Sequence, residues 1–497
     1  MRAGTTTMNK RRSGAFAIGL PVRAAVVVSG VAAVLIGAAP ALAHTSERAF
    51  VLLLPTGYYM TAGAIAVGAT FLLLAFIPKG ISDRMADARL RLISLTPPTP
   101  VPTSLVSFAI LVVLVLAGFF GTHDPLENPL PLTIWTLWWI VFSILTAIVG
   151  NMWAYLNPWS GPLAVLRAVL RWRTGHHPLT LPARIGFGIA ILQFLGFAWF
   201  EKINVAPADP EFLAQAVALY WLTNLIAALL FGDDWFVRAE PFSIFFRFIA
   251  RLSPLVWEPA SGPATDGRVR LSLAMPGAAL LDRDALPLSG VVFLLLTLTL
   301  ESFDGLSETF WWLGLNGINP LEYPGRSAMI WINTWGLLAS WVVLILVYTI
   351  ATGLGWLLAG RPGSLRALLG TLVFSIMPIA LGFHFSHYLT AVLIDLQYAL
   401  AAASDPFHTG ANLLGYDETM VTTSFLNTHD GVKTIWNAQT AGIVIGHVLG
   451  ILLAHELACR AIPDYRAAVL SQGPLALVMV AYTLFGLWLL SSPVAGG

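Results

Sequence analysis

Three ionisable side chains stand inside a stretch that is otherwise apolar enough to cross a membrane. Residues 376–398 carry His384, His387 and Asp395, and Tyr388 follows directly after the second histidine. At about 100° of rotation per helical residue, His387 lies about 60°, Tyr388 about 40° and Asp395 about 20° from His384. Ionisable groups at bilayer depth are costly and usually face a protein interior or a wet cavity. We therefore expect the rest of the chain to be organised around this stripe.

A third histidine occupies a comparable depth in the next apolar run. His447 lies near the middle of residues 436–457, which run in the opposite direction and should pack beside the first stretch. Three imidazoles, from His384, His387 and His447, can bind zinc, copper or iron, and Asp395 could be a further ligand or orient one. The alternative interpretation is that the histidines only hold helices together by hydrogen bonds.

Acidic residues near the outer end of another apolar run are candidates for proton transfer. Glu301 and Asp304 belong to the sequence LESFDGLSETFWW, and Asp304-Gly305 suggests a turn where a helix leaves the bilayer. We expect these two carboxylates to line the mouth of a cavity that reaches down to His384, with Asp395 as a base or as the partner of a metal ligand.

The first 43 residues read as a secretory signal peptide. Lys10, Arg11 and Arg12 precede an apolar core at 24–36, and Ala41-Leu42-Ala43 fits an A-x-A cleavage site. An uncleaved anchor helix is the alternative. Cleavage would make His44 the N-terminus, and an N-terminal histidine can chelate copper through its amine and its ring.

The composition is that of a polytopic membrane protein. Apolar residues make up 57% of the chain and charged residues 11%, whereas a soluble domain carries roughly 25% charged residues. The net charge of +1 lacks the excess of basic residues that nucleic-acid-binding proteins carry. With Cys459 as its only cysteine, the chain can form neither an intrachain disulfide nor a cysteine cage for a metal.

The elements that must position these residues are membrane helices. The sequence predicts an all-α transmembrane bundle with about ten spans in residues 44–497. Lys and Arg gather in alternate loops, including a long one near 232–286, so we place those loops in the cytoplasm and both mature termini outside. Within the long loop, 243–252 sets Arg247 and Arg251 among aromatics and predicts an interfacial amphipathic helix. The predicted spans lie near 52–77, 103–120, 132–150, 184–200, 213–231, 287–301, 329–358, 367–401, 436–457 and 474–491.

Several stretches spread over the mature chain resemble one family. They are GNMWAYLNPW (150–159), LFGDDWFVRAEPFSIFF (230–246), FDGLSETFWW (303–312), PIALGFHFSHYL (378–389), SDPFHTGANLLG (404–415) and GHVLGILLAHE (446–456). Together they resemble bacterial integral membrane proteins catalogued as fenitrothion hydrolase. The resemblance implies hydrolysis of a lipophilic organophosphorus triester in the bacterial inner membrane, and it implies a second membrane subunit as partner.

The candidate residues are compatible with that chemistry and with others. A divalent metal held by histidines would supply a hydroxide at neutral pH and a Lewis acid for the phosphoryl group. The same histidines would serve a transporter of copper or another metal, or one coupled to protons. His384 and His447 on facing helices would also suit a haem or quinone electron-transfer protein. The sequence alone does not decide between these three hypotheses.

Overall fold

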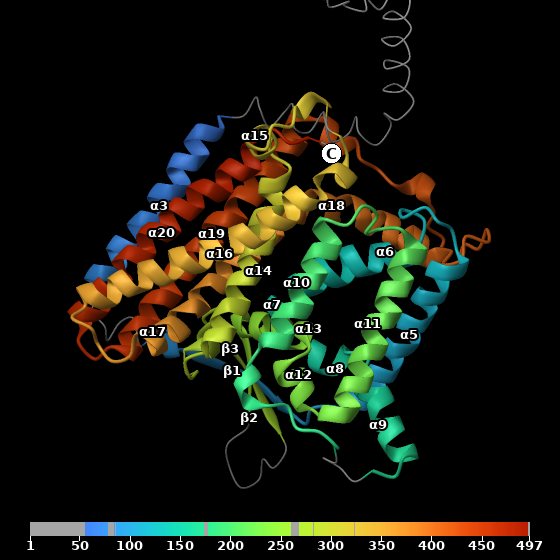
Figure 1. Ribbon diagram of the computed structural model, residues 1–497, viewed down its shortest axis with the longest axis horizontal. Coiled ribbons are helices and arrows are strands. Elements are labelled where there is room, and N and C mark those ends of the chain that lie inside the picture. Colours follow the sequence, from blue (N-terminus) through green and yellow to red (C-terminus); the bar gives the residue numbers. More distant parts are fainter. Residues whose placement is uncertain are drawn as a thin grey trace, which may run out of the picture.

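The structure is an all-α bundle of long apolar helices with one small sheet (Figure 1). It is a computed structural model, and it describes residues 55–77, 84, 86–172, 177–259, 268–281, 283–322 and 324–495. The predicted signal peptide 1–43 and His44 lie outside these residues. Within them, nine helices are long and apolar enough to cross a membrane, which confirms the prediction of a multi-span helical bundle.

The nine candidate spans follow the predicted apolar runs. They are α3 (Thr56–Phe76), α5 (Pro100–Phe120), α6 with η1 and α7 (Pro129–Val149), α11 (Pro210–Phe231), α14 (Leu288–Ser307), α16 (Arg326–Leu358), α17 with η6 and α18 (Leu365–Ser404), α19 (His429–Ala461) and α20 (Tyr465–Ser491).

The predicted span at 184–200 is a shorter helix. The helix α10 (Gly188–Lys202) has 15 residues, so at 1.5 Å per residue it is about 22 Å long, less than the roughly 30 Å of a hydrocarbon core. It ends on Glu201 and Lys202, and both side chains are buried against other helices. The polar end of α10 therefore lies inside the protein.

The helix α14 is the centre of the bundle. Its residues are buried on nearly every side, because α10, α16 and α18 all pack against it. A helix that is apolar all round fits such a position. The helix continues to Ser307, so Asp304 and Gly305 lie within it and not in the turn that the sequence suggested.

Glycines bring α18 (Met377–Ser404) and α19 close together. A Cβ atom added at Gly382 would lie 2.6 Å from the carbonyl oxygen of Gly442, and one added at Gly446 would lie 2.6 Å from that of Pro378. Small residues let membrane helices approach backbone to backbone. This crossing fixes the rotation of α18 and so decides which of its side chains face α14.

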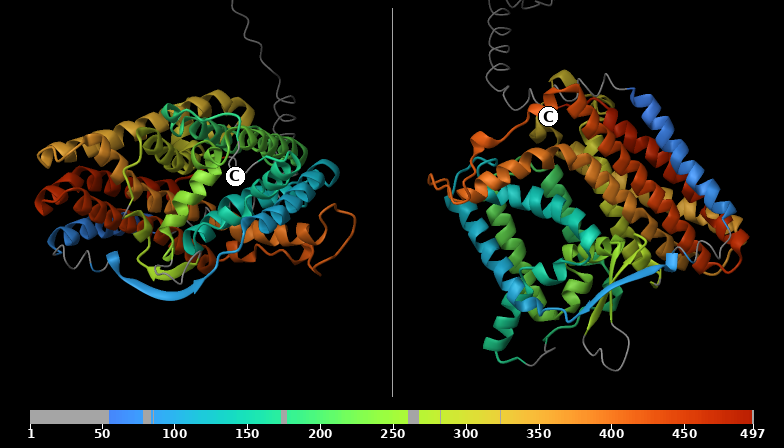
Figure 2. Two further views of the ribbon diagram at one scale, coloured as in Figure 1. Left: turned by 90° about the horizontal axis from the view of Figure 1, so that it is seen from below. Right: turned by 180° about the vertical axis from the view of Figure 1, so that it is seen from behind.

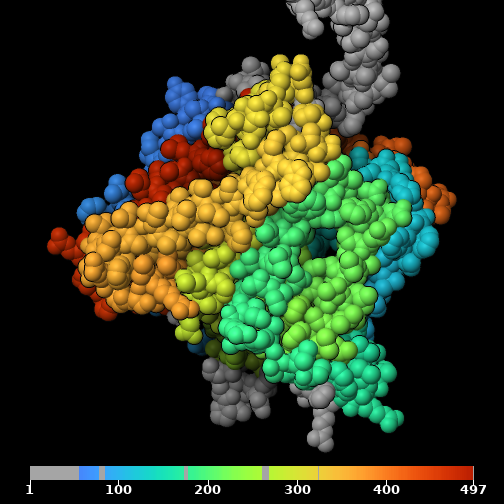
Figure 3. Space-filling model, viewed as in Figure 1, coloured from blue at the N-terminus to red at the C-terminus, as the bar shows by residue number. Residues whose placement is uncertain are grey.

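Beside this bundle the outer helices form a second group. The helix α5 packs against α9 (Ser160–Val169) and α11, while η1 (Leu132–Val141), a π-helical segment, packs against α18. Figure 2 shows the two groups side by side, and Figure 3 shows that the surface is hollowed between α10 and α11.

A three-stranded antiparallel sheet joins two of the basic loops. Its strands are β1 (Arg89–Leu95), β2 (Leu255–Pro259) and β3 (Val269–Ala274), in the order β1-β3-β2. The strand β1 lies in the loop before α5, and β2 and β3 lie in the loop before α14. Because β1 pairs with β3, both loops must lie on the same side of the bundle, as the charge pattern predicted for them.

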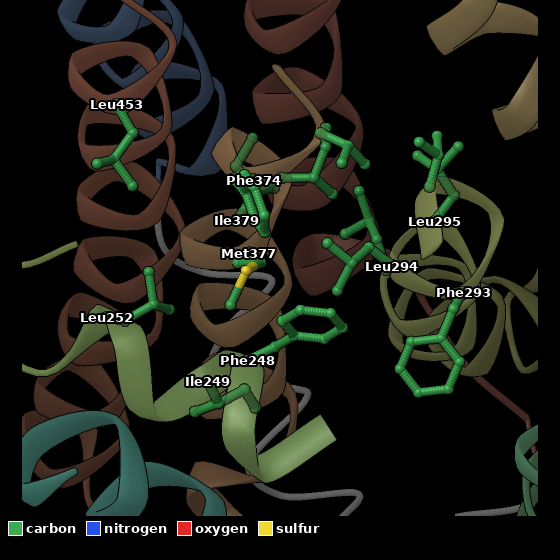
Figure 4. Close-up of a cluster of buried hydrophobic side chains, with 14 of the residues drawn as sticks. Phe248, Ile249, Leu252, Phe293, Leu294, Leu295, Phe374, Met377, Ile379 and Leu453 are labelled. Carbon is green, nitrogen blue, oxygen red and sulfur yellow. The ribbon is translucent and has the colours of Figure 1, made fainter. Parts of the chain in front are cut away.

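The segment predicted as an interfacial helix lies inside the protein instead. The helix α13 (Pro241–Ile249) buries Phe242, Phe245, Phe246 and Phe248. Figure 4 shows Phe248 among Met377 of α18 and Leu294 of α14. The apolar face of α13 therefore packs on helices rather than on lipid, and it forms a wall below the candidate site.

Candidate functional site: a buried network of charged side chains

Two histidine–carboxylate pairs connect α14 with α18. Glu301 and Asp304 are three residues apart on α14, and His384 and His387 are three residues apart on α18. Residues three apart share one face of a helix. The nitrogen Nδ1 of His384 lies 2.9 Å from Oε1 of Glu301, and Nε2 of His387 lies 2.7 Å from Oδ2 of Asp304. The pairs thus form two levels, a deep one and an outer one.

The deep pair holds one proton between its two members. Nε2 of His384 lies 3.1 Å from the carbonyl oxygen of Trp139 in η1, and a carbonyl can only accept, so Nε2 carries a hydrogen. The remaining proton sits between Nδ1 of His384 and Oε1 of Glu301, on the ring or on the carboxyl. Either way the pair is neutral overall, as its burial requires.

A small cavity adjoins the deep pair. It has a volume of about 20 Å³ and is lined by His384 and Glu301, by Phe245 and Phe248 of α13, and by apolar residues of α14 and α18. A single water molecule needs roughly 10–15 Å³ in the same measure. Among the described residues Oε2 of Glu301 has no hydrogen-bond partner, so a water at this point would meet an acceptor.

Lys202 ties the outer pair to a third carboxylate. Its Nζ donates to Oδ2 of Asp304 and to Oε1 of Glu201, each at 2.7 Å. Tyr388 closes the group: its hydroxyl contacts Nζ of Lys202 and lies 3.0 Å from Oε1 of Glu201. A lysine among carboxylates is the arrangement by which buried charges are made tolerable.

The charges of the outer group depend on His387. Glu201 and Asp304 carry two negative charges when ionised and Lys202 carries one positive charge, so the group has a net charge of −1 while His387 is neutral and zero when it is protonated. The side chain of His387 is 29% exposed, against 4% for His384. The outer histidine is therefore much more exposed than the deep one.

The structure brings together four of the seven predicted site residues. His384, His387, Glu301 and Asp304 meet in the network, although as two ion pairs rather than as ligands and a cavity mouth. Asp395 lies eleven residues beyond His384, about 16 Å further along the helix, where Oδ2 accepts from Thr136 of η1 at 3.0 Å. His44 is outside the described residues.

His447 has the predicted depth but faces another way. Gly446 abuts Gly382 at the helix crossing, and the ring of His447 lies 6.0 Å from that of Phe383, which is on a different face of α18 from His384. Its Nδ1 donates to the carbonyl oxygen of Ile443 at 2.8 Å. The sequence predicted how far along α19 His447 lies, but it did not predict the rotation of α19 about its axis.

The predicted three-histidine metal site does not assemble. In the part of the chain that the structure describes, no group of three or more His, Cys, Asp or Glu side chains is placed to hold a metal ion. Both ring nitrogens of His384 already engage protein oxygens, so neither points a lone pair at a ligand position in this arrangement.

Sequence reasoning missed Glu201 and Lys202. In the sequence they directly follow the predicted span 184–200, which places them in the loop beyond it. The available signal was an adjacent Glu-Lys pair directly at the end of an apolar run. Such a helix end can stop inside the protein, and an adjacent Glu-Lys there can pair with charges of other helices.

Comparison with known protein families, with curated proteins and with solved structures finds no match to this chain.

Proposed function

We propose that this chain is a proton-coupled membrane transporter in which the network of α10, α14 and α18 takes up and releases the coupled proton. The observation that carries the proposal is the charge of the outer group. With Glu201 and Asp304 both ionised, a net charge of −1 among these buried side chains is unfavourable, and one proton on His387 or on Glu201 removes it. Ionisable groups that face the interior of a helix bundle commonly form proton pathways.

In this proposal the outer level of the network takes up the proton first and the deep level receives it. With Nε2 of His387 donating to Asp304, the proton would bind at Nδ1, the other nitrogen of this partly exposed ring. The deep pair lies one helical turn further in and holds a proton that can sit on either partner. Transfer between the two levels would need a water or a rotation of a side chain, because no direct hydrogen bond links them among the described contacts.

Proton binding is the first test. Purified protein in unbuffered detergent solution is taken through a pH step, and the protons taken up per molecule are counted for wild type and for His387→Gln. We expect the variant to take up about one proton fewer near neutral pH. Ser424→Ala is the matched control, because Ser424 is exposed in the segment before α19 and has no group that titrates near neutral pH; it should take up as many protons as wild type.

Proton flux is the second test. The protein is reconstituted into liposomes, a potassium gradient with valinomycin makes the interior negative, and a trapped dye reports acidification. Without its cargo the transporter should still let protons leak inward, so wild type should acidify the lumen faster than protein-free liposomes, and His387→Gln should abolish the difference. If His387→Gln liposomes acidify as fast as wild type, the network is not the proton pathway and the proposal fails.

Hydrolysis of an organophosphorus triester is the second candidate function. Asp304 contacts Nε2 of His387 and so leaves Nδ1 as the nitrogen that would take a proton from water, which is how a general base that activates water is held. The lipophilic substrate would reach this site from the membrane. The resemblance in the sequence favours the same activity, and a second subunit belongs to this proposal.

The two candidates make different predictions for Glu301. Release of nitrophenol from fenitrothion would measure hydrolysis by membranes that contain each variant. A hydrolase should lose activity in His387→Ala and keep most of it in Glu301→Gln, because only His387 would touch the attacking water. A transporter should lose proton flux in both variants.

A further inference from the structure

A large pocket lies between the sheet and the ends of the helices, and α13 separates it from the small cavity beside the buried network. Its volume is about 720 Å³, within the range of about 300–1,000 Å³ that is usual for small-molecule sites. It extends from Val149, the last residue of α7 (Phe142–Val149), to the strands β1 and β2. It therefore sits where a membrane span gives way to the loops of the basic side.

Among the residues that the structure describes, four arginines and one acidic residue line this pocket. The arginines are Arg89, Arg247, Arg251 and Arg283, and the acid is Glu258. Glu258 stands on β2 directly opposite Arg270 of β3, so a further basic residue lies beside it. Among the ion pairs of the described residues none includes one of the four arginines.

Contacts with neutral groups hold three of these guanidinium groups in place. Arg247 donates to the carbonyl oxygen of Val237 at 2.6 Å, Arg283 donates to that of Ala279 at 3.3 Å, and Arg251 lies 5.4 Å from the centre of the Phe248 ring. A carbonyl or an aromatic ring positions a guanidinium without cancelling its full charge. The pocket therefore keeps a concentration of positive charge.

The arginines also disfavour one another's charge. Burial, together with the nearby Arg283 and Arg247, lowers the pKa of Arg251 to about 10. Like charges that are held close together are relieved by an anion that binds between them. Arginine is the residue that best matches the geometry of phosphate oxygens.

The rest of the lining is largely apolar. Leu95, Val149, Val256 and the rings of Tyr155 and Trp257 contribute to it. The indole nitrogen of Trp257 donates to the carbonyl oxygen of Val149 at 3.1 Å and so fixes this wall. A free inorganic anion would gain nothing from such a wall, whereas a lipid would bury part of its glycerol and acyl chains there.

We infer that this pocket binds the phosphate headgroup of an acidic phospholipid, with Arg251 and Arg283 as its principal anion contacts. Basic pockets between membrane helices on the cytoplasmic side are suited to such headgroups. The site is separate from the network proposed to carry protons, and it would anchor the sheet and α13 to the membrane surface.

The test compares lipids and a free anion on the intact protein. The protein is placed in nanodiscs of phosphatidylcholine, with or without added phosphatidylglycerol, and retained lipid is identified by native mass spectrometry after release. Wild type should retain phosphatidylglycerol in preference to phosphatidylcholine. Arg251→Gln/Arg283→Gln should weaken that retention by about tenfold or more, since charged hydrogen bonds are lost.

Two controls keep the outcome decisive. Arg366→Gln removes one exposed charge at the start of α17 (Leu365–Leu372), outside the pocket lining, and should retain lipid like wild type. Arg251→Lys keeps the charge and should retain more phosphatidylglycerol than Arg251→Gln. Equal retention of both lipids by wild type, or unchanged retention in the double variant, would overturn the inference.

Inorganic phosphate separates the two sources of a phosphate group. It is added to the nanodiscs as a competitor at increasing concentration. We expect it to displace phosphatidylglycerol only weakly, because it cannot use the apolar wall. If inorganic phosphate displaces the lipid readily and stabilises the detergent-solubilised protein to the same extent as the lipid does, the pocket is a site for a soluble anion and the lipid assignment is wrong.

Discussion

The proton that His384 and Glu301 share determines which substitutions each position tolerates. A glutamine at position 301 can donate its amide hydrogen to Nδ1 of a neutral His384, whose Nε2 keeps its bond to Trp139. An alanine at position 384 instead leaves the Glu301 carboxyl buried without its partner. The pair is therefore asymmetric with respect to substitution.

This asymmetry gives a prediction for stability. Glu301→Gln should lower the free energy of unfolding by less than about 1 kcal/mol, whereas His384→Ala should lower it by about 3 kcal/mol or more. Thermal unfolding of the purified variants in one detergent measures both. Equal losses would mean that the proton is not shared as the hydrogen bonds imply.

Glu240 gives a pH-dependent prediction outside the membrane spans. Its buried carboxyl accepts from the Tyr220 hydroxyl and from the backbone nitrogens of Phe242 and Ser243, at the start of α13. Burial raises the pKa of this carboxyl above its ordinary value of 4.5. The folded state therefore binds the proton more tightly than the unfolded chain does.

The sign of the effect follows from linkage. The stabilisation that the protonated Glu240 gives is fully present below pH 4.5 and is lost as the pH rises through the pKa of the folded state. In Glu240→Gln the decline of the melting temperature above pH 4.5 should become shallower, while the exposed Glu211→Gln should melt like wild type at each pH. An unchanged pH profile in Glu240→Gln would contradict this origin.

At this scale the sequence predicted residue types better than partners. It singled out Glu301, Asp304, His384 and His387 because charged groups in apolar runs are rare. It could not predict that the four form two pairs, because that depends on how far α14 and α18 are rotated toward each other. The sequence did not predict Lys202 as a site residue, because it did not show that its helix ends inside the protein.

The close packing of α18 against α19 fixes the rotation of α18 relative to α14. The crossing of α18 and α19 leaves no room for a side chain at Gly446, where a Cβ would lie 2.6 Å from the carbonyl oxygen of Pro378. Any substitution there must separate the two backbones. Such a movement would also turn His384 and His387 relative to α14.

The corresponding prediction pairs Gly446 with a glycine that has space. Gly446→Val should destabilise the protein by about 1–3 kcal/mol through overpacking, and it should reduce proton uptake together with stability. Gly353→Ala, in α16, should be neutral or stabilise by up to about 1 kcal/mol, since nothing lies within 4 Å of the new Cβ. Unfolding in detergent compares the two, and a fully stable Gly446→Val would show that the crossing can loosen.

The helix α13 shows where an element's own pattern is insufficient. Its arginines among aromatic residues suggested the membrane surface, and the arginines do point to the loop side, where they line the large pocket. The aromatic side chains, however, pack on Trp138 and Phe194 of neighbouring helices. A pattern of polarity identifies two faces, but it does not say whether lipid or protein covers the apolar one.

At the scale of the whole molecule, the sheet supports the arrangement of the loops. Strands from two basic loops pair with each other, so those loops share one side, which the charge pattern alone had predicted. The sequence did not predict the sheet, because its strands lie far apart in the chain. Which side of the membrane the sheet occupies stays a prediction.

Cysteine labelling tests that prediction. In a Cys459→Ser background, Arg361→Cys marks the loop after α16 and Glu418→Cys marks the loop before α19, and both positions are exposed. A membrane-impermeant maleimide should label the Glu418→Cys protein in intact cells and the Arg361→Cys protein only after permeabilisation. The reverse pattern would invert the topology and place the arginine pocket outside.

The spacing of the two histidine–carboxylate pairs has an electrical consequence. His384 and His387, like Glu301 and Asp304, are three residues apart, so a proton passing between the levels moves about 4.5 Å along the helices. A hydrocarbon core is about 30 Å thick, and the step therefore crosses about a seventh of the membrane voltage. At roughly 2.3 kcal/mol per charge for 100 mV, the voltage contributes only about 0.3 kcal/mol to this transfer. Any strong voltage dependence of proton flux would thus arise in the paths that connect the pairs with the two aqueous sides.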